Sequence, residues 1–225
     1  MSWDRWIRTV EIEPSLYAAD FAQLADQVDV LLRTGARVFH FDVGDGHFVE
    51  PITVGPVVLQ SIAQQIHAGD GVVDCHLMVN EPEHHLAMFK AAGADSITFH
   101  YEAAANIGAV RDLARRAGLQ VGLAFNPETD VDDVAARAEG FDLVLCMTIH
   151  PGYSGQELLP EAIDRIRRLR QALPKDVHVQ VDGGIKFENV RSIYDAGANL
   201  IVAGSAIFGM EDLPRAYRRL VQALA

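Results

Sequence analysis

Short apolar segments alternate with amphipathic segments along the whole chain. Eight of the apolar segments are too short for helices, and most are rich in Val, Ile and Phe, so we predict that they are β-strands. They span residues 10–16, 37–43, 72–79, 96–101, 120–125, 143–149, 178–181 and 200–203. Eight further segments repeat apolar residues at helical spacing, which predicts helices. These span residues 21–32, 56–66, 83–92, 107–117, 131–138, 157–173, 187–196 and 213–224.

This alternation predicts the fold class. Strands that alternate with helices pair in parallel, and eight such units in 225 residues fit an α/β fold of the closed (β/α)8, or TIM, barrel type. We predict a single barrel domain over residues 1–225, with residues 1–9 as an N-terminal extension. The alternative is a doubly wound open sheet. That fold usually has a glycine-rich turn after its first strand, and residues 16–20 contain no glycine.

Capping residues mark several of the predicted helix ends. Asp20 stands just before the segment 21–32 and is predicted to be its N-cap. Glycine stands just past four of the predicted helices, at positions 35, 93, 118 and 197. Glycine is common there because it readily adopts the left-handed conformation that ends a helix.

Composition and charge exclude several classes of protein. Lys and Arg total 19 and Asp and Glu total 31, a net charge of −12, and the lack of a basic run argues against nucleic-acid binding. Cys75 and Cys146 lie in separate apolar runs, which predicts buried thiols rather than a disulfide framework. The polar segment 1–8 is unlike a signal peptide and no apolar run is long enough to cross a membrane, so we expect a cytoplasmic enzyme.

Polar residues stand at the predicted carboxyl ends of several strands, where the active site of a barrel lies. His40 and Asp42 are two residues apart on one strand, so their side chains point to the same face. His76 and Asp182 occupy equivalent positions on two other strands. Two imidazoles and two carboxylates together suit one divalent ion such as Zn²⁺, Fe²⁺, Mn²⁺ or Co²⁺. A single strand histidine is more often a hydrogen-bonded core residue, but four such residues at one rim favour a metal site.

Glycines follow the last three predicted strands. Residues 151–156 (PGYSGQ) follow the sixth strand, Gly183 and Gly184 follow the seventh, and Gly204 and Ser205 follow the eighth. Small residues let backbone N–H groups approach an anion closely, and many barrels bind phosphate with the loops after strands seven and eight. This arrangement favours a phosphate site, with glycines that only shape the turns as the alternative.

Several stretches of the chain, from about residue 10 to residue 210, resemble the ribulose-phosphate 3-epimerase family. They are residues 14–16 (PSL), 19–21 (ADF), 40–49 (HFDVGDGHFV), 74–79 (DCHLMV), 147–156 (MTIHPGYSGQ), 181–185 (VDGGI) and 203–208 (AGSAIF). Together they are highly specific for this family, which has a ribulose-phosphate-binding barrel. They are less specific for the ketose phosphate that is turned over.

The resemblance implies a reaction and a set of site residues. It implies that His40, Asp42, His76 and Asp182 hold one divalent metal ion per chain. Asp42 and Asp182 would exchange protons with C3 of D-ribulose 5-phosphate or D-xylulose 5-phosphate through a metal-stabilised enediolate. It also implies substrate contacts at Ser15, His40, His76, Met78, Gly152, Tyr153, Ser154, Gly155, Asp182, Gly183, Gly184, Gly204 and Ser205. Family members are commonly oligomers, so the expected partners are a phosphorylated ketose and further copies of the chain, without nucleic acid or membrane.

The chain departs from the family at several positions near these motifs. Gly44 stands where the family usually has Met, and the missing side chain would leave space beside Asp42. Glu13, His150 and Ser154 also differ from the usual residues, and we predict that all of these departures lie at or near the pocket. They put the substrate in doubt, so a 3-epimerase of another ketose phosphate, such as allulose 6-phosphate, is the nearest alternative. The other is that the changes are compensated and the substrate is the family's own.

Other functions are found on related barrels. A Schiff-base aldolase would need an inward lysine on a late strand, but Lys90, Lys175 and Lys186 all lie outside the predicted strands. A related decarboxylase would need Asp and Lys together at strand ends, and that pairing is missing. A non-catalytic sugar-phosphate-binding homologue is the third alternative, although every proposed metal ligand is intact.

Overall fold

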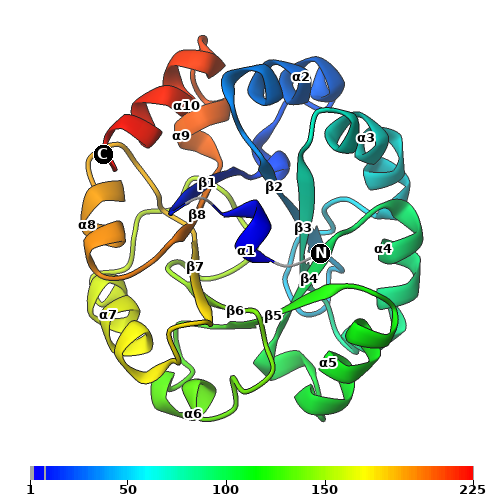
Figure 1. The fold of residues 1–225 in the computed structure, drawn as a ribbon, viewed down its shortest axis with the longest axis vertical. Helices are drawn as coiled ribbons and strands as arrows, with labels where there is room; N and C mark the ends of the chain where they lie inside the picture. The colour runs from blue at the N-terminus through cyan, green and yellow to red at the C-terminus, as the bar shows by residue number, and fades with distance from the viewer. Residues whose placement is uncertain (1–2, 8, 225) are drawn as a thin grey trace.

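Eight parallel strands form the centre of the computed structural model, which describes residues 3–7 and 9–224 (Figure 1). The strands are β1 (Glu11–Pro14), β2 (Val38–Gly44), β3 (Val72–Met78), β4 (Ser96–His100), β5 (Gln120–Phe125), β6 (Leu143–Met147), β7 (His178–Asp182) and β8 (Leu200–Ala203). They pair in the order β1-β8-β7-β6-β5-β4-β3-β2. A bridge between Ser15 and His40 then joins the end of β1 to β2. The predicted TIM barrel is confirmed, and each strand lies inside, or extends by one residue beyond, its predicted segment.

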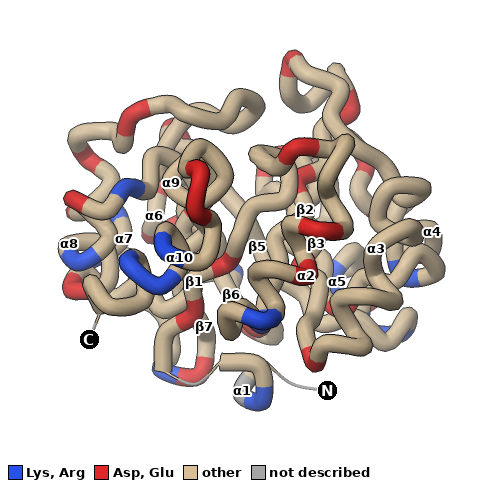
Figure 2. Tube along the Cα trace, turned by 90° about the horizontal axis from the view of Figure 1, so that it is seen from above, with Lys and Arg blue, Asp and Glu red and all other residues tan. Residues whose placement is uncertain are grey.

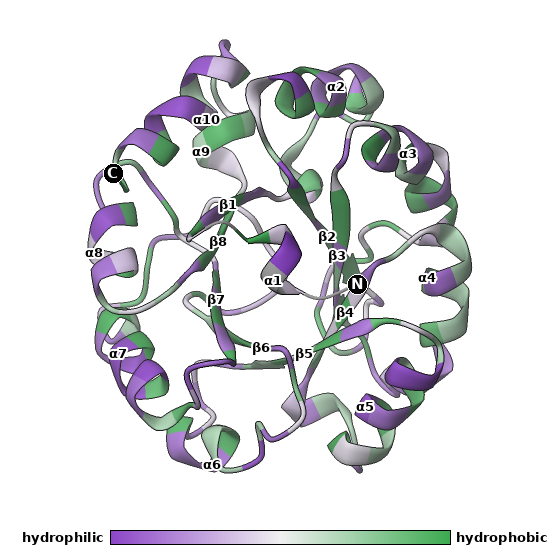
Figure 3. Ribbon diagram, viewed as in Figure 1, coloured by the Kyte–Doolittle hydropathy of each residue, from purple (hydrophilic) through white to green (hydrophobic). Residues whose placement is uncertain are grey.

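Helices form a ring outside the strands (Figure 1). The helices of the ring are α2 (Leu24–Thr34), α3 (Pro56–Ala68), α4 (Leu86–Ala92), α5 (Ile107–Arg116), α6 (Val131–Ala135), α7 (Ala162–Ala172), α8 (Val190–Asp195) and α10 (Leu213–Gln222). Shorter elements are α9 (Ser205–Phe208) and the 3-10 turns η1 (Leu16–Ala18), η2 (Pro82–His84) and η3 (Tyr101–Ala103). Each helix of the ring carries both polar and apolar residues (Figure 3), as the sequence pattern predicts. Within the described residues, no helix combines the length and the apolar character that crossing a bilayer requires.

The first helix of the ring begins later than predicted. Helix α2 starts at Leu24, and its N-cap is Gln23 rather than Asp20. The carboxylate of Asp20 instead accepts hydrogen bonds from the Ala22 backbone N–H and the Gln23 side chain, both at 2.9 Å. Asp20 therefore stabilises the turn that precedes the helix. The predicted helix-ending glycines are confirmed, with φ of +110°, +111°, +76° and +114° at positions 35, 93, 118 and 197.

The hydrophobic core lies between the strands and the ring of helices. On β2, Phe39 and Phe41 are fully buried in this core, and Cys75 of β3 and Val28 of α2 belong to the same cluster. Phe39 and Phe41 point outward from the barrel into this core. Because side chains alternate along a strand, the residues next to them in the sequence point toward the barrel interior. The apolar core thereby sets the orientation of the polar residues that form the site.

The N-terminal helix α1 (Trp3–Trp6) lies across the end of the barrel opposite the carboxyl ends of the strands. It projects onto the barrel axis in Figure 1 and lies below the strands in Figure 2. Trp3 is 1% exposed and packs in a cluster with Val38, Val72 and Leu143, the first residues of β2, β3 and β6. This segment therefore packs on the barrel and covers its amino-terminal end.

Candidate active site

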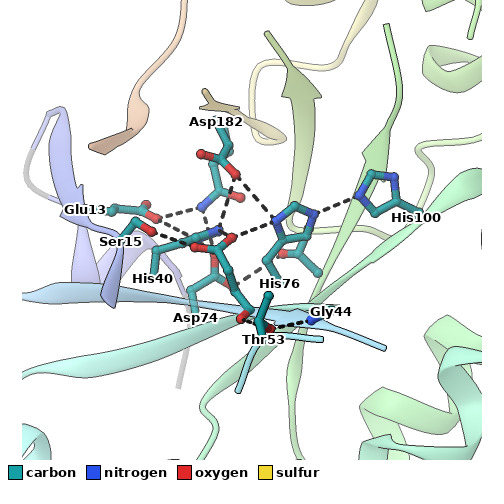
Figure 4. Close-up of polar contacts among 12 residues, drawn as sticks. Glu13, Ser15, His40, Gly44, Thr53, Asp74, His76, His100 and Asp182 are labelled. Carbon is teal, nitrogen blue, oxygen red and sulfur yellow. Dashed lines mark hydrogen bonds and ion pairs between the residues drawn. The ribbon is translucent and has the colours of Figure 1, made fainter. Parts of the chain in front are cut away.

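The barrel brings together the four side chains that the sequence predicts as metal ligands. His40 and Asp42 point inward from β2, and the strand register pairs Asp42 directly with His76 of β3. His76 Nδ1 lies 3.2 Å from Asp42 Oδ1 and 3.6 Å from Oδ2 of Asp182, on β7. His40 Nε2 lies 3.2 Å from Asp42 Oδ1. Figure 4 shows the side chains of His40, His76 and Asp182 pointing toward one another. One nitrogen or oxygen from each residue lies within 4.8 Å of the others.

The chemistry of this cluster fits a divalent cation. His40 Nε2 is buried and has no hydrogen-bond partner, although it faces two carboxylates. Burial alone would lower the pKa of His40, but the Asp42 carboxylate raises it well above its usual value. Burial would likewise raise the pKa of Asp42, but His40 holds it far below its usual range. A positive charge between the imidazoles and carboxylates is therefore favoured, and two nitrogens with two oxygens suit Zn²⁺, Fe²⁺, Mn²⁺ or Co²⁺.

A second layer of buried polar side chains lies behind His40. Asp74 Oδ2 lies 3.2 Å from His40 Nδ1, which orients the imidazole so that Nε2 faces the cluster. The Gln180 amide donates to Asp74 Oδ2 at 2.8 Å and to Glu13 Oε2 at 2.7 Å. Burial raises the pKa of Glu13 to about 7. Glu13 is thus buried beneath the cluster, where it contacts Gln180 and His40.

The second ring nitrogen of His76, which faces away from the carboxylates, contacts another histidine. Its Nε2 lies 2.9 Å from Nε2 of His100, the last residue of β4. His100 Nδ1 lies 3.3 Å from Glu102 Oε2, and burial lowers the pKa of His100 to about 4. Glu102 Oε1 accepts from the Asn126 backbone N–H at 2.8 Å and from the Thr129 hydroxyl. His100 is therefore neutral at pH 7.

Two of the predicted substrate contacts, His40 and His76, are fully buried in the cluster. A pocket at the carboxyl ends of the strands is lined by the rest of the predicted set. These residues are Ser15, Met78, Gly152, Tyr153, Ser154, Gly155, Asp182, Gly183, Gly184, Gly204 and Ser205. Asp42 also lines this pocket, and the Ser15 hydroxyl donates to Asp42 Oδ2 at 2.6 Å. The Asp182 side chain is 17% exposed, so both carboxylates can be reached from the pocket.

The glycines of the late loops have backbone roles as well. Gly183 and Gly184 have φ of +110° and +70°. A Cβ on Gly183 would lie 2.1 Å from Ile149 Cγ1, and one on Gly184 would lie 2.5 Å from the Leu158 backbone nitrogen. The fold therefore requires glycine here whether or not a phosphate binds. Gly204 is less constrained, because a Cβ there would meet Ala18 Cβ at 3.2 Å, a tight contact, and the Ser154 hydroxyl oxygen at 3.4 Å.

The predicted space at Gly44 is absent. A Cβ added there would lie 2.8 Å from both the Pro51 carbonyl oxygen and Val49 Cγ2. The Thr53 hydroxyl accepts from the Gly44 N–H at 2.7 Å and donates to the Asp42 carbonyl at 3.0 Å. The expectation of an opened wall beside Asp42 is therefore wrong, because the loop after β2 folds back and fills the position.

Two other family departures also lie outside the pocket lining. Glu13 is fully buried beneath the cluster. The His150 side chain is 61% exposed and pairs with Glu128, with His150 Nδ1 2.9 Å from Oε1. Of the four departures expected at or near the pocket, only Ser154 lines it.

Four contributors to the site were not singled out from the sequence. Asp74 and Gln180 each stand two residues before a predicted ligand, His76 and Asp182, and so share its inward face. That spacing could have identified Asp74 and Gln180 from the sequence as inward-facing residues. His100 and Glu102 carry no such spacing, since their role depends on how β4 lies against β3.

The fold and the site together define a class of protein. A parallel (β/α)8 barrel whose paired carboxylates and imidazoles converge at the carboxyl ends of the strands, beside a glycine-lined pocket, is an enzyme architecture. The model of the ribulose-phosphate 3 epimerase family matches residues 11–208, and the chain belongs to this family. It is accordingly an epimerase, an enzyme of the isomerase class.

Individual relatives agree with this assignment. The ribulose-phosphate 3-epimerase of Escherichia coli K12 is 37% identical, over 95% of this chain and 96% of the relative. The enzyme of the same name from Schizosaccharomyces pombe is 40% identical, over 88% of this chain and 86% of the relative. Among solved structures, 3-hexulose-6-phosphate synthase from Salmonella typhimurium has a TM-score of 0.75 at 18% identity, covering 95% of this chain and 98% of that one. At that identity it shows the shared fold alone.

Proposed function

We propose that the chain interconverts D-ribulose 5-phosphate and D-xylulose 5-phosphate by moving a proton at C3 between Asp42 and Asp182. The observation that carries this proposal is the placement of two carboxylates, from β2 and β7, around one pair of imidazoles. Asp42 Oδ1 and Asp182 Oδ2 lie 3.2 Å and 3.9 Å from the same atom, His40 Nε2. A sugar carbon at the mouth of this cluster would have one carboxylate on each side.

The reaction needs two groups because the configuration at C3 is inverted. A base removes the proton from one face, and an acid returns a proton on the other face. One aspartate is therefore ionised while the other is protonated, and the two exchange these states when the reaction reverses. Both carboxylates contact the same imidazole, that of His76. The Ser15 hydroxyl, donating to Asp42 Oδ2, holds this carboxylate in a fixed orientation.

One divalent metal ion, held by His40, Asp42, His76 and Asp182, belongs to the proposal. When bound, it would supply positive charge that stabilises the enediolate oxygens, by several kcal/mol. The buried, unpartnered His40 Nε2 supports this ligand set. The Asp74 carboxylate at His40 Nδ1 keeps the proton on that nitrogen and leaves Nε2 free to coordinate.

The phosphate would bind at the other end of the pocket, at Gly183, Gly184, Gly204 and Ser205. Neither Lys nor Arg occurs among the described residues that line the pocket. A phosphate there would rely on backbone N–H groups and hydroxyls, which can hold an anion without a formal positive charge. The Ser154 hydroxyl lies over Gly204 and would add one more donor at this end.

The family's own substrate is favoured over a larger or differently shaped one. The main reason to expect another ketose phosphate was space at Gly44, and that position is filled by the loop after β2. Allulose 6-phosphate is the nearest alternative substrate, and the expected homo-oligomer remains a prediction.

A turnover panel of pentulose 5-phosphates and hexulose 6-phosphates, run in D₂O, tests the proposal. We expect the highest kcat/KM with D-ribulose 5-phosphate, and one solvent deuterium at C3 of the product. A higher kcat/KM with allulose 6-phosphate would replace the proposed substrate but keep the chemistry. Product without deuterium at C3 would contradict the proton-transfer mechanism.

A further inference from the structure

We propose that His100 and Glu102 are positioning residues that fix the tautomer of His76, so that its Nδ1 carries the lone pair that binds the metal. This inference rests on the proposed metal site. It adds two residues that lie outside the ligand set and outside the pocket lining. They act on the metal only through the ring of His76 (Figure 4 shows the contact between the two imidazoles).

The two imidazoles must share one proton. Their Nε2 atoms lie 2.9 Å apart, and both residues are fully buried. Two N–H groups facing each other at that distance would repel, and two bare nitrogens would leave both without a donor. One ring therefore donates and the other accepts.

Glu102 decides which ring donates. Its Oε2 faces His100 Nδ1 at 3.3 Å, and a carboxylate can only accept. His100 therefore carries a proton on Nδ1, and its Nε2 is left to accept, because a second proton there would place a buried cation against a ligand of the proposed divalent metal ion. His76 must then carry a proton on Nε2, which leaves its Nδ1 as the lone-pair nitrogen, 3.2 Å from Asp42 and 3.6 Å from Asp182.

Glu102 is itself held in place by residues that follow β5. Its Oε1 accepts from the Asn126 backbone N–H, at 2.8 Å, and from the Thr129 hydroxyl. The Phe48 ring also packs against His100, with ring centroids 4.7 Å apart. The backbone donor fixes which carboxylate oxygen faces His100, so the proton arrangement does not depend on a mobile group.

The substitution Glu102→Gln should reverse the direction of two hydrogen bonds, the one between residue 102 and His100 and the one between His100 and His76. The Asn126 N–H needs an acceptor, so the new amide would place its oxygen there and its NH₂ group toward His100 Nδ1. His100 would then accept at Nδ1 and donate from Nε2, and neutral His76 would carry its proton on Nδ1. The metal would have to displace that proton, while the size of the side chain stays nearly unchanged.

The test measures Co²⁺ affinity and ring protonation on the metal-stripped full chain. Co²⁺ binding is followed by its visible absorption, and ¹⁵N NMR assigns the protonated nitrogen of His100. We expect Glu102→Gln to weaken Co²⁺ binding by about 10- to 100-fold and to move the His100 proton from Nδ1 to Nε2. Glu128→Gln is the matched control, since Glu128 also faces a histidine Nδ1, at 2.9 Å on the exposed His150, and it should change neither quantity.

Each outcome has a separate meaning. Co²⁺ affinity of Glu102→Gln within threefold of wild type, or an unchanged His100 tautomer, would overturn the positioning role. A wild-type His100 protonated on Nε2 would overturn it even if the variant does not fold. A wild-type chain that binds no Co²⁺ would instead refute the metal site itself. Normal Co²⁺ binding without turnover of any ketose phosphate would refute only the proposed reaction.

Discussion

The hydroxyl of Ser15 donates a 2.6 Å hydrogen bond to Oδ2 of Asp42, and so links the end of β1 to the carboxylate carried by β2. The other oxygen of Asp42 lies between the two imidazoles, 3.2 Å from each. Asp42 is therefore held from both sides, and neither oxygen is free to rotate. Proton transfer at a fixed carbon benefits from such a fixed carboxylate, because a misplaced base loses much of its rate advantage.

Ser15→Ala should lower kcat by about 10- to 100-fold, because a hydrogen bond to a charged group contributes about 1.5–3 kcal/mol. Steady-state kinetics measure the effect, with Ser61→Ala as the control. The Ser61 hydroxyl donates to a backbone carbonyl on an exposed part of α3. Unchanged kcat in Ser15→Ala would show that orientation of Asp42 does not depend on this bond.

Asp42→Asn and Asp182→Asn should each reduce turnover by about 10²- to 10⁴-fold, the usual range for loss of an acid or base. Circular dichroism should show an intact barrel, since both residues lie at the carboxyl ends of strands rather than in the apolar core. Deuterium exchange at C3 without net epimerisation gives a sharper readout. The variant that retains its base should still wash substrate deuterium out into H₂O, and a variant with near-normal epimerisation would contradict the two-aspartate scheme.

Removal of the metal with a chelator should reduce turnover on the order of 10³-fold or more, because the charge stabilisation at stake is several kcal/mol. Metal analysis of the untreated protein should find close to one divalent ion per chain. Activity should return when Zn²⁺, Fe²⁺, Mn²⁺ or Co²⁺ is restored. A chelated protein that is free of metal and fully active would refute the cofactor.

Glu13→Gln should make the metal-free protein more stable than wild type above neutral pH. Burial raises the pKa of Glu13 from 4.5 to about 7, so the folded state retains a proton that the unfolded chain loses. The contribution of Glu13 to the free energy of unfolding is therefore fully present below pH 4.5. It is lost as the pH rises toward 7, by up to about 3 kcal/mol. Urea denaturation at pH 5 and pH 8 measures the difference between the two proteins. A difference that does not change with pH would show that Glu13 does not titrate in this range.

Gly44→Ala should destabilise the protein by about 1–3 kcal/mol, because the added Cβ would lie 2.8 Å from the Pro51 carbonyl oxygen. Gly108→Ala in α5 is the matched control. Its Cβ would meet only Asn106 Oδ1, at 3.5 Å, and alanine at a helical position should stabilise by up to about 1 kcal/mol. Thermal denaturation of both variants distinguishes them, and a neutral Gly44→Ala would restore the idea of space at this position.

The barrel and the convergence of His40, Asp42, His76 and Asp182 could be predicted from the sequence, because both depend on local periodicity. Phe39 and Phe41 alternate with His40 and Asp42, so an apolar core on one face turns the polar residues to the other. The start of α2 was harder to predict, since Asp20 can equally close a turn or cap a helix. That choice depends on the packing of the loop rather than on residue type.

Contacts between distant segments could not be predicted from the sequence. Gly44 is filled by residues five to nine positions later, and only the path of the loop places them there. Gln180 joins Glu13 to Asp74 because ring closure brings β1, β3 and β7 to face one interior. Spacing along one strand identifies inward residues, but barrel closure decides which of them meet.

Helix α1 has a practical consequence for spectroscopy. The chain has two tryptophans, Trp3 and Trp6, and their rings contact each other edge to face with centroids 4.8 Å apart. Both lie at the end of the barrel away from the pocket. Intrinsic tryptophan emission should therefore report on folding at the amino-terminal end of the barrel. It should stay unchanged when a sugar phosphate binds at the carboxyl ends of the strands.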